Sequence, residues 1–295
     1  MTSRELEIFH AVMSCRSLTE AAASLHISQP ALSKAVKRLE DRLRLPLFRR
    51  VSGRLRPTPE AESLYPEAAR LLREIGSLGR TAMEMRGGEV GLLRVAASAS
   101  LGLSVVPEAI TAFAAEFPKV KVVSHFLPAS GIAELIVDNH IDVGMTLSPV
   151  ELPGTSSQSL ATAPMVCAVR EDDPLAAKSV LRPRDLATSR LISFGSDSYF
   201  GRLLDECFDR DGVERRIGIE LVTAVQAVPL VLCGAGLAVV DGYMQRAGFS
   251  GVAWRPFAPE IRVPVSVVTA TKRPTSRLAN RFIAHLAAAV EASAA

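Results

Sequence analysis

Apolar residues recur with helical spacing at the start of the chain. In residues 4–14 the apolar positions include Leu6, Phe9, Val12 and Met13. From residue 29 they return in steps of four, three and four, at Leu32, Val36, Leu39 and Leu43. Such steps place the side chains in one stripe of a helix, so both segments are predicted to be helices that pack by one face.

A short helix and a tight turn are predicted between these two. Thr19 is a candidate N-cap, and Glu20 in the first turn suits the positive end of a helix. The small face of this helix consists of Ala21, Ala22 and Ala23. Residues 25–27 leave room for a turn, Ser28 is a second N-cap, and Pro30 fits the first turn of the next helix. Two helices joined in this way form a helix-turn-helix arrangement.

A longer amphipathic helix is predicted for residues 59–85. Its apolar positions are Ala61, Leu64, Ala68, Leu71, Leu72, Ile75, Leu78, Ala82 and Met85. Gly87 and Gly88 follow as a natural stop. Because the helix is longer than an ordinary one, the sequence favours its pairing with another helix.

After Gly88 the pattern alternates between strands and helices. Strands are predicted at 92–97, 120–127, 141–145, 165–169, 190–194, 237–240 and 263–270. Helices are predicted at 101–117, 130–139, 198–210, 223–233 and 275–290. The alternation predicts a multidomain α/β protein in which a mostly parallel sheet is covered on both faces.

Positive charge is concentrated near the predicted helix pair. Between Ser28 and Arg56, nine lysines and arginines stand against two acids, which gives this segment roughly +7. The whole chain of 295 residues carries a formal net charge of only +3. Local charge of this kind suits a surface that binds DNA phosphates. Residues 51–54 predict a wing-like turn with Arg54 at its tip, where an arginine can enter a minor groove.

The composition of the chain indicates its cellular compartment and argues against a membrane span and a metal site. The chain contains no run of about twenty apolar residues, so a membrane span is not expected. The first residues carry Glu5 and Glu7 and lack a signal-peptide pattern, and the four cysteines are scattered, so we expect a reduced, cytoplasmic location. His10 and His26 have no partner at metal-ligand spacing, so neither a metal nor a cofactor is expected.

The N-terminal segment resembles a known family. The matching residues are Leu6, Phe9, Ser17, Thr19, Ala21, Ala22, Leu25, residues 28–33 (Ser-Gln-Pro-Ala-Leu-Ser), Leu39, Glu40, Leu43, residues 47–50 (Leu-Phe-Arg-Arg), Pro57 and Thr58. They resemble the winged helix-turn-helix of LysR-type transcriptional regulators, and the similarity extends over the whole chain. The resemblance implies three parts: a DNA-binding domain at 1–58, a dimerising linker helix at 59–88, and an effector-binding domain at 89–295.

The resemblance also assigns roles to DNA-binding residues. It implies that Gln29, Pro30, Ser33 and Lys34 meet base edges in the major groove, with lysine at a position where the family often has arginine. A lysine cannot make the planar two-pronged contact of arginine with guanine. Arg54 matches the wing arginine. The phosphate contacts would be Lys37, Arg38, Arg49 and Arg50.

For the effector domain, the resemblance implies two lobes similar to periplasmic binding proteins. Lobe I would span about 89–164 and 268–295, and lobe II about 165–267. Strand 165–169 would cross into lobe II, and strand 263–270 would return from it. The implied partners are double-stranded DNA with a dyad operator, a small-molecule effector, further copies of the chain in a dimer or homotetramer, and RNA polymerase.

Hydroxyl groups follow the predicted strands. Ligands of open α/β sheets bind beyond the carboxyl ends of the strands. The candidate effector-binding residues there are Ser98, Ser100, Ser130, Thr146, Ser148, Ser196, Asp197, Thr223 and Asp241. Hydroxyls and free amides suit a carboxylate, and Asp241, which stands where many family members have proline, could pair with an ammonium group.

The end of the chain points to a subgroup. Residues 254–257 (Trp-Arg-Pro-Phe) and 272–277 (Lys-Arg-Pro-Thr-Ser-Arg) look like those of the lysine-biosynthesis and opine-catabolism regulators. Together with Asp241, this similarity favours an amino acid or an amino-acid-like compound as the effector.

Other functions stay open at this point. The chain contains no G-x-S-x-G, H-E-x-x-H or phosphate-loop motif, so no catalytic residues are assigned and an enzyme is not expected. A thiol redox sensor on the same DNA-binding module would use Cys207 and Cys233, although both are predicted to lie on helices. The last alternatives are a solute-binding protein and a hydrolase that uses the α/β cleft.

Overall fold

The computed structural model describes residues 1–15, 17–51, 54–85 and 91–294. The chain divides into two compact units, Met1–Ala82 and Met83–Ala295, and each is described by itself. None of the described helices is both long enough and apolar enough to cross a membrane.

The first unit begins with three helices, α1 (Ser3–Ser14), α2 (Leu18–Ser24) and α3 (Gln29–Leu43). Ser17, not Thr19, caps α2 and accepts a hydrogen bond from the Glu20 amide, so the predicted helix start was two residues late. Ser28 caps α3 as predicted, with proline in the first turn. In the turn between α2 and α3, His26 takes a left-handed φ of 53°, which lets two helices meet after a very short connection.

Two small apolar clusters hold these helices together. Ile8 of α1, Ala22 of α2 and Leu32 and Val36 of α3 belong to one cluster. Phe9, on the next face of α1, packs with Leu39 of α3 in the other. The predicted apolar stripe of α3 is therefore buried from Leu32 to Leu39, and the opposite face stays exposed.

A hairpin follows, formed by β1 (Phe48–Val51) and β2 (Arg54–Pro57). The strands pair antiparallel, with Phe48 opposite Pro57 and Val51 opposite Arg54. The predicted tip at residues 52 and 53, together with the Arg54 side chain, lies outside what the structure describes.

The long helix α4 (Pro59–Met85) has the predicted bounds. One face, with Ala61 and Ala68, is buried in the cluster that contains Leu6 and Phe9 of α1 and Leu39 of α3. Tyr65 joins this contact, since its hydroxyl lies 2.8 Å from Ser14 Oγ and its ring meets Phe9 edge-on. The predicted stop at Gly87 and Gly88 lies in a segment that the structure does not describe.

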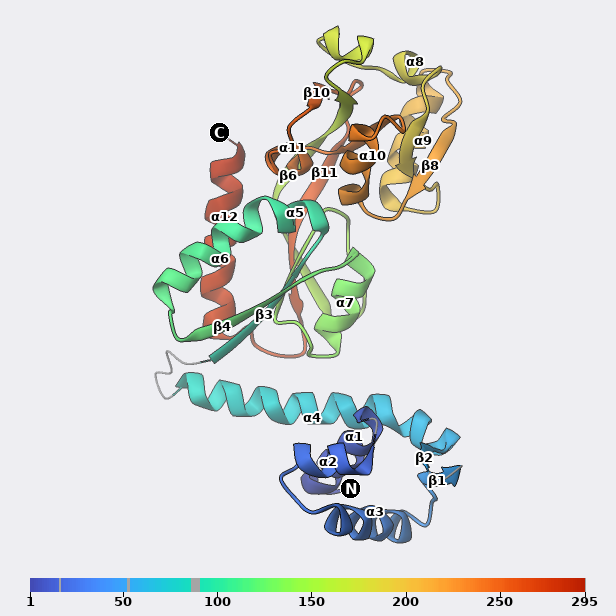
Figure 1. The fold of residues 1–295 in the computed structure, drawn as a ribbon. Helices are drawn as coiled ribbons and strands as arrows, with labels where there is room; N and C mark the ends of the chain where they lie inside the picture. Colours follow the sequence, from blue (N-terminus) through green and yellow to red (C-terminus); the bar gives the residue numbers. More distant parts are fainter. Residues whose placement is uncertain (16, 52–53, 86–90, 295) are drawn as a thin grey trace. The chain divides into compact units, whose positions relative to one another are not determined.

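The second unit is built on a mixed sheet of nine strands in the order β4-β3-β5-β11-β6-β9-β7-β8, with β10 paired to β6 (Figure 1). The strands are β3 (Gly91–Ala97), β4 (Val120–Phe126), β5 (Val143–Thr146), β6 (Thr155–Arg170), β7 (Leu191–Phe194), β8 (Ile217–Leu221), β9 (Leu237–Asp241), β10 (Val252–Pro256) and β11 (Arg262–Ala270). β3 is parallel to β4 and β5, and β7 is parallel to β8 and β9. The middle of the sheet is antiparallel. The prediction of a mostly parallel sheet is therefore correct only for the two ends of the sheet.

Strand β6 is far longer than the predicted strand 165–169. Its first part, from Thr155 to Pro164, pairs with β11, and its last part pairs with β9 and β10. The first part is rich in serine and threonine and largely exposed, so it lacks the apolar run that marks a buried strand. Strands β8 and β10 were not predicted. β8 carries an alternating pattern, with Ile217, Ile219 and Leu221 on one side, which the prediction overlooked, while β10 is short and shows no alternation.

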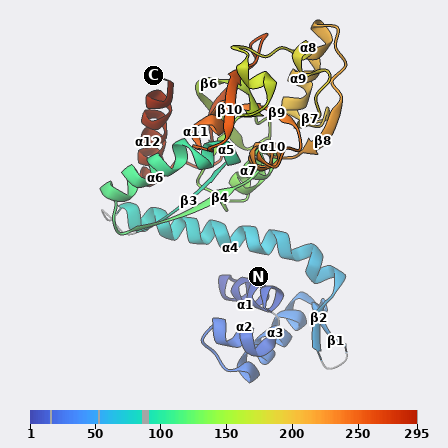
Figure 2. The ribbon, with the colours of Figure 1, turned by 45° about the horizontal axis from the view of Figure 1, so that its top comes forward.

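The helices of this unit are α5 (Ala99–Leu103), α6 (Val105–Glu116), α7 (Ala129–Val137), α8 (Pro183–Leu186), α9 (Tyr199–Arg210), α10 (Ala227–Leu232), α11 (Tyr243–Arg246) and α12 (Arg277–Ala294), with 3-10 turns η1 (Pro174–Ala177) and η2 (Ala224–Gln226). Figures 1 and 2 show α6 and α12 side by side, where the rings of Phe113 and Phe282 meet edge-on.

The predicted helix 101–117 is in fact two helices, α5 and α6, which break at Ser104. The Ser104 hydroxyl donates to the Ser100 carbonyl at 2.7 Å, while the Ser104 amide turns to Leu101. A side chain that takes the helical acceptor competes with the backbone, which explains the break. The predicted helix 223–233 is likewise divided into η2 and α10.

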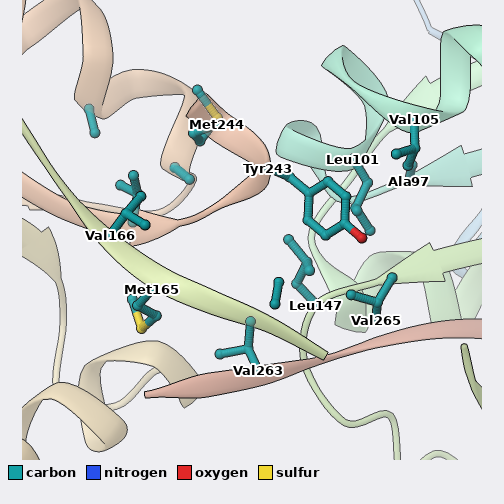
Figure 3. Close-up of a cluster of buried hydrophobic side chains, with 14 of the residues drawn as sticks. Ala97, Leu101, Val105, Leu147, Met165, Val166, Tyr243, Met244, Val263 and Val265 are labelled. Carbon is teal, nitrogen blue, oxygen red and sulfur yellow. The ribbon is translucent and has the colours of Figure 1, made fainter. Parts of the chain in front are cut away.

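The main core of the second unit runs along both sides of β6. Figure 3 shows part of this core, with Val166 of β6 near Met244 and Val265 of β11 near Leu147. All four belong to one continuous cluster of buried side chains. β6 thus connects two halves, each with helices of its own.

Candidate functional site

A cationic, exposed face lies on α3. Lys34, Lys37 and Arg38 are exposed there, beside the exposed Pro30. Gln29 and Ser33 are half-buried on the first turns. Since Leu32, Val36 and Leu39 turn inward, these polar side chains share the outer surface of the helix.

The hairpin adds further cations. Arg49 and Arg50 are exposed on β1, and Arg49 lies opposite the exposed Arg56 of β2. Whether Arg54 joins them stays a prediction, because its side chain is not described. Helix and hairpin together present a basic surface of the kind that contacts a phosphate backbone.

Two acidic side chains near this surface already have partners within the protein. Glu40 Oε1 accepts hydrogen bonds from the Leu47 and Phe48 amides, at 2.8 and 2.9 Å, and so fixes the entry into β1. Glu5 of α1 forms an ion pair with Arg42. No role for Glu40 could be predicted from local patterns, because its partners become neighbours only when the hairpin folds back on α3.

A separate cavity of about 280 Å³ opens in the second unit. It lies beyond the carboxyl ends of β3, β5, β7 and β9, where the sequence placed a ligand. Six candidate residues line it: Ser98, Ser100, Ser130, Ser148, Thr223 and Asp241.

Three other candidates lie outside the lining. Thr146 is fully buried, and its hydroxyl donates to the Ser148 carbonyl at 3.1 Å. Ser196 accepts a hydrogen bond from Arg215, and the Asp197 carbonyl accepts one from Arg202. These groups support the loops around the cavity.

Asp241 is the most unusual residue of the cavity because it is an acidic residue that is only 2% exposed. Its Oδ2 accepts from Ser100 Oγ at 2.6 Å, and its Oδ1 accepts from the Tyr243 amide at 3.1 Å. Burial raises the pKa of Asp241 to about 6, while these hydrogen bonds act in the opposite direction. At neutral pH the cavity therefore contains a largely ionised, partly satisfied carboxylate, which suits a cationic group of a ligand.

Sequence reasoning missed the apolar side of the cavity. Phe194, Tyr199, Phe200 and Val222 line it next to the predicted serines. Tyr199 and Phe200 stand in the first turn of α9, where Ser198 caps the Gly201 amide at 3.0 Å. The signal was present as an aromatic pair directly after the cap, but apolar residues of an amphipathic helix more often face the core.

The cysteines do not form a poised thiol pair. Cys207 is buried, and burial raises the pKa of its thiol, so the reactive thiolate is disfavoured. Cys233 is exposed at the end of α10. Over the described part of the chain, no three histidine, cysteine or acidic side chains come together as a metal site would require.

Comparisons with known proteins cover both units. The family "Bacterial regulatory helix-turn-helix protein, lysR family" matches residues 3–62, and "LysR substrate binding domain" matches residues 86–291. The transcriptional activator protein LysR of Escherichia coli (strain K12) is 33% identical over 288 residues, which cover 97% of this chain and 92% of that protein. Regulatory protein NocR of Agrobacterium fabrum (strain C58 / ATCC 33970) is 31% identical over 291 residues, which cover 98% of this chain and 97% of that protein.

Solved structures agree on the fold. Full-length CbnR in complex with its target DNA has a TM-score of 0.76 and 23% identity, and the match covers 98% of this chain and 100% of that one. The basic helix-turn-helix and the ligand-sized cavity thus lie in the two parts that the family models match. The chain therefore belongs to the LysR family of DNA-binding transcriptional regulators, with an effector-binding domain after its helix-turn-helix.

Proposed function

We propose that this regulator binds an amino acid or an amino-acid-like effector in the cavity of its second unit. The observation that carries the proposal is Asp241, a buried carboxylate that lines a cavity rich in hydroxyl groups. The carboxylate would pair with the ligand's ammonium group. The hydroxyls of Ser98, Ser130 and Ser148 would bind the ligand's carboxylate.

The size of the cavity and the named relatives support this choice. A volume of about 280 Å³ is at the lower end of the range of small-molecule pockets, which fits a compact ligand. The octopine catabolism/uptake operon regulatory protein OccR of Rhizobium meliloti is 28% identical over 282 residues, which cover 96% of this chain and 94% of that protein. Its name connects it with an operon for the catabolism and uptake of octopine.

On the DNA side, α3 would enter the major groove. Gln29, Pro30, Ser33 and Lys34 would meet base edges, because they occupy the first turns of the exposed face. The cations Lys37, Arg38, Arg49 and Arg50 would hold phosphates and fix the register without reading sequence. Arg54 stays a predicted wing contact.

Helix α4 would pair with α4 of a second copy. Leu64, Leu71, Ile75 and Leu78 are 38%, 36%, 46% and 71% exposed in the single chain. Their spacing of seven, four and three follows a heptad seam, and the adjoining Ala61 and Ala68 pack in the chain's own cluster with α1 and α3. Two DNA-binding domains joined in this way would read the half-sites of a dyad operator, and two dimers would form the tetramer.

The proposed domains are residues 1–58, 59–88 and 89–295. Lobe I would comprise about 89–164 and 268–295, and lobe II about 165–267. The pairing of Arg262 with Pro164 supports a return to lobe I a few residues before 268. Location in the cytoplasm and contact with RNA polymerase stay predictions.

Regulation would follow from the position of Asp241. Its hydrogen bond to Ser100 links α5, beside β3, with the end of β9. A ligand ammonium that bound this carboxylate would compete with or reinforce that link. The effector would thereby favour one arrangement of the two halves, as any coupling to DNA binding requires.

Calorimetric titration of the purified full-length protein tests the proposal. An L-amino acid should bind at one site per chain and should change the affinity for operator DNA found by genomic footprinting. Binding of an aromatic acid without an amino group, and of no amino acid, would refute the effector class. Turnover of the bound compound would instead support the hydrolase alternative.

A further inference from the structure

The charges around the cavity restrict the ligand beyond its class. Among the described residues that line it, Asp241 is the only acid, and no lysine, arginine or histidine occurs. An amino acid brings one ammonium and one carboxylate, which Asp241 and the hydroxyls can satisfy. A second charge on its side chain would have no partner in the lining, and burying an unpaired charge is costly. The charge balance therefore favours a neutral side chain.

The other side of the cavity is aromatic. The rings of Phe194 and Phe200 lie 4.9 Å apart, and those of Tyr199 and Phe200 lie 5.6 Å apart in an edge-on arrangement. Val222 is 80% exposed although it also lines the cavity. Apolar surface of this kind is stabilised when a ligand covers it. We call Phe194, Tyr199 and Phe200 the aromatic wall.

Arg215 fixes this wall from outside the cavity. Its side chain is only 2% exposed and pairs with Asp205 at 2.7 Å. Its guanidinium also donates to the carbonyl of the wall residue Phe194 at 2.8 Å and to that of Gly201, which directly follows Phe200, at 3.3 Å. Further bonds reach Ser193 and Ser196.

The loop held by Arg215 is packed tightly. A Cβ atom at Gly201 would lie 1.9 Å from the Gly195 carbonyl oxygen, so α9 approaches the loop as closely as glycine permits. Ser198 bridges the same contact, because its hydroxyl donates to the Gly195 carbonyl at 2.7 Å. A shift of Arg215 would therefore be transmitted to the positions of Tyr199 and Phe200.

We propose that the aromatic wall selects an amino acid with a neutral, apolar side chain, that Tyr199 and Phe200 determine this specificity, and that Arg215 is its positioning residue. The inference rests on the proposed amino-acid effector. It adds which amino acids bind and which residues discriminate among them.

The test is calorimetric titration of the full-length protein with L-leucine, L-phenylalanine, L-alanine, L-glutamate and L-lysine. L-Leucine or L-phenylalanine should bind at least about tenfold more tightly than L-alanine, because burying the larger apolar side chain contributes that much binding free energy or more. Phe200→Ala should reduce this ratio about tenfold, and Tyr199→Ala should reduce it in the same direction.

The Arg215→Lys variant tests whether Arg215 positions the aromatic wall or only stabilises the fold. Lysine keeps the charge but cannot reproduce the guanidinium fork, so the ratio of leucine to alanine affinity should fall several-fold. Arg210→Ala, at the exposed far end of α9, the helix that carries Tyr199 and Phe200, is the control and should keep the wild-type ratio. Loss of thermal stability in Arg215→Lys with an unchanged ratio would contradict the positioning role.

The outcomes distinguish the two proposals. If L-glutamate or L-lysine binds as tightly as L-leucine, or if Phe200→Ala keeps the ratio, the inference is wrong while the amino-acid effector stands. If the wild-type protein binds none of the five compounds, the inference is wrong, and if it then binds an aromatic acid without an amino group, the proposed effector class is wrong as well.

Discussion

Ser100 Oγ donates a hydrogen bond of 2.6 Å to Asp241 Oδ2, across 141 residues of sequence. Ser100 belongs to the short helix after β3, and Asp241 ends β9. Both are buried, so the bond is shielded from water and stronger than one at the surface. It places a titratable group at the junction of the two halves of the second unit.

The Asp241→Asn variant should bind an amino-acid effector at least about tenfold more weakly, because it replaces a charge-assisted bond to the ammonium with a neutral one. Ser100→Ala should have a smaller effect, because the carboxylate keeps its charge. Calorimetry at neutral pH measures both. Equal affinity of wild type and Asp241→Asn would show that the ammonium binds elsewhere.

The stability of the wild-type protein should contain a contribution from Asp241 that depends on pH. Because burial raises its pKa from 3.8 to about 6, the folded protein holds this proton more tightly than the unfolded chain does. The contribution is fully present below about pH 4 and is lost as the pH rises to about 6. Chemical denaturation of wild type and Asp241→Asn should show their difference changing across this range, and a constant difference would contradict the buried ionisation.

DNA binding should respond differently to two groups of substitutions. Lys37→Ala or Arg38→Ala should weaken binding to all sequences and lower the slope of log affinity against log salt by about one unit. Gln29→Ala should instead reduce the preference for the operator. Arg42→Ala is a suitable control on the same helix, because Arg42 is paired with Glu5. A salt slope unchanged by Lys37→Ala would remove it from the phosphate contacts.

Ile75→Glu and Leu71→Glu should shift the protein from dimer towards monomer, since each places a charge in the proposed seam of α4. Sedimentation velocity at micromolar concentration measures the change. Glu62→Ala, at an exposed position of the same helix, should sediment as wild type does. Dimers that persist in both glutamate variants would mean that association uses another surface.

Glu40→Ala should destabilise the DNA-binding domain by about 1–3 kcal/mol, because the Leu47 and Phe48 amides lose their shared acceptor. DNA affinity should fall together with the stability, because the bonds from these amides to Glu40 hold the start of the hairpin in place. Thermal unfolding and a DNA titration of this variant check the two effects. Unchanged unfolding would show that water replaces the carboxylate at little cost.

Local chemistry explains which elements could be predicted. α3 and α4 carry long apolar stripes and clear caps or stops, so their type and approximate bounds followed from periodicity alone. The first part of β6 is exposed and polar, and β10 is short, so neither carries a pattern that stands out. The break at Ser104 depends on one side-chain bond to a carbonyl, which propensity cannot resolve.

The sequence by itself determined the DNA-binding helix pair, the long helix and the row of hydroxyls after the strands, because each depends on residues close together in the chain. Only the tertiary structure decided which hydroxyls share a cavity, that Asp241 is buried beside Ser100, and that Arg215 holds the aromatic wall. Those relations join residues from different strands and helices. Burial and hydrogen bonding between distant segments depend on how the sheet is ordered, and local periodicity does not encode that order.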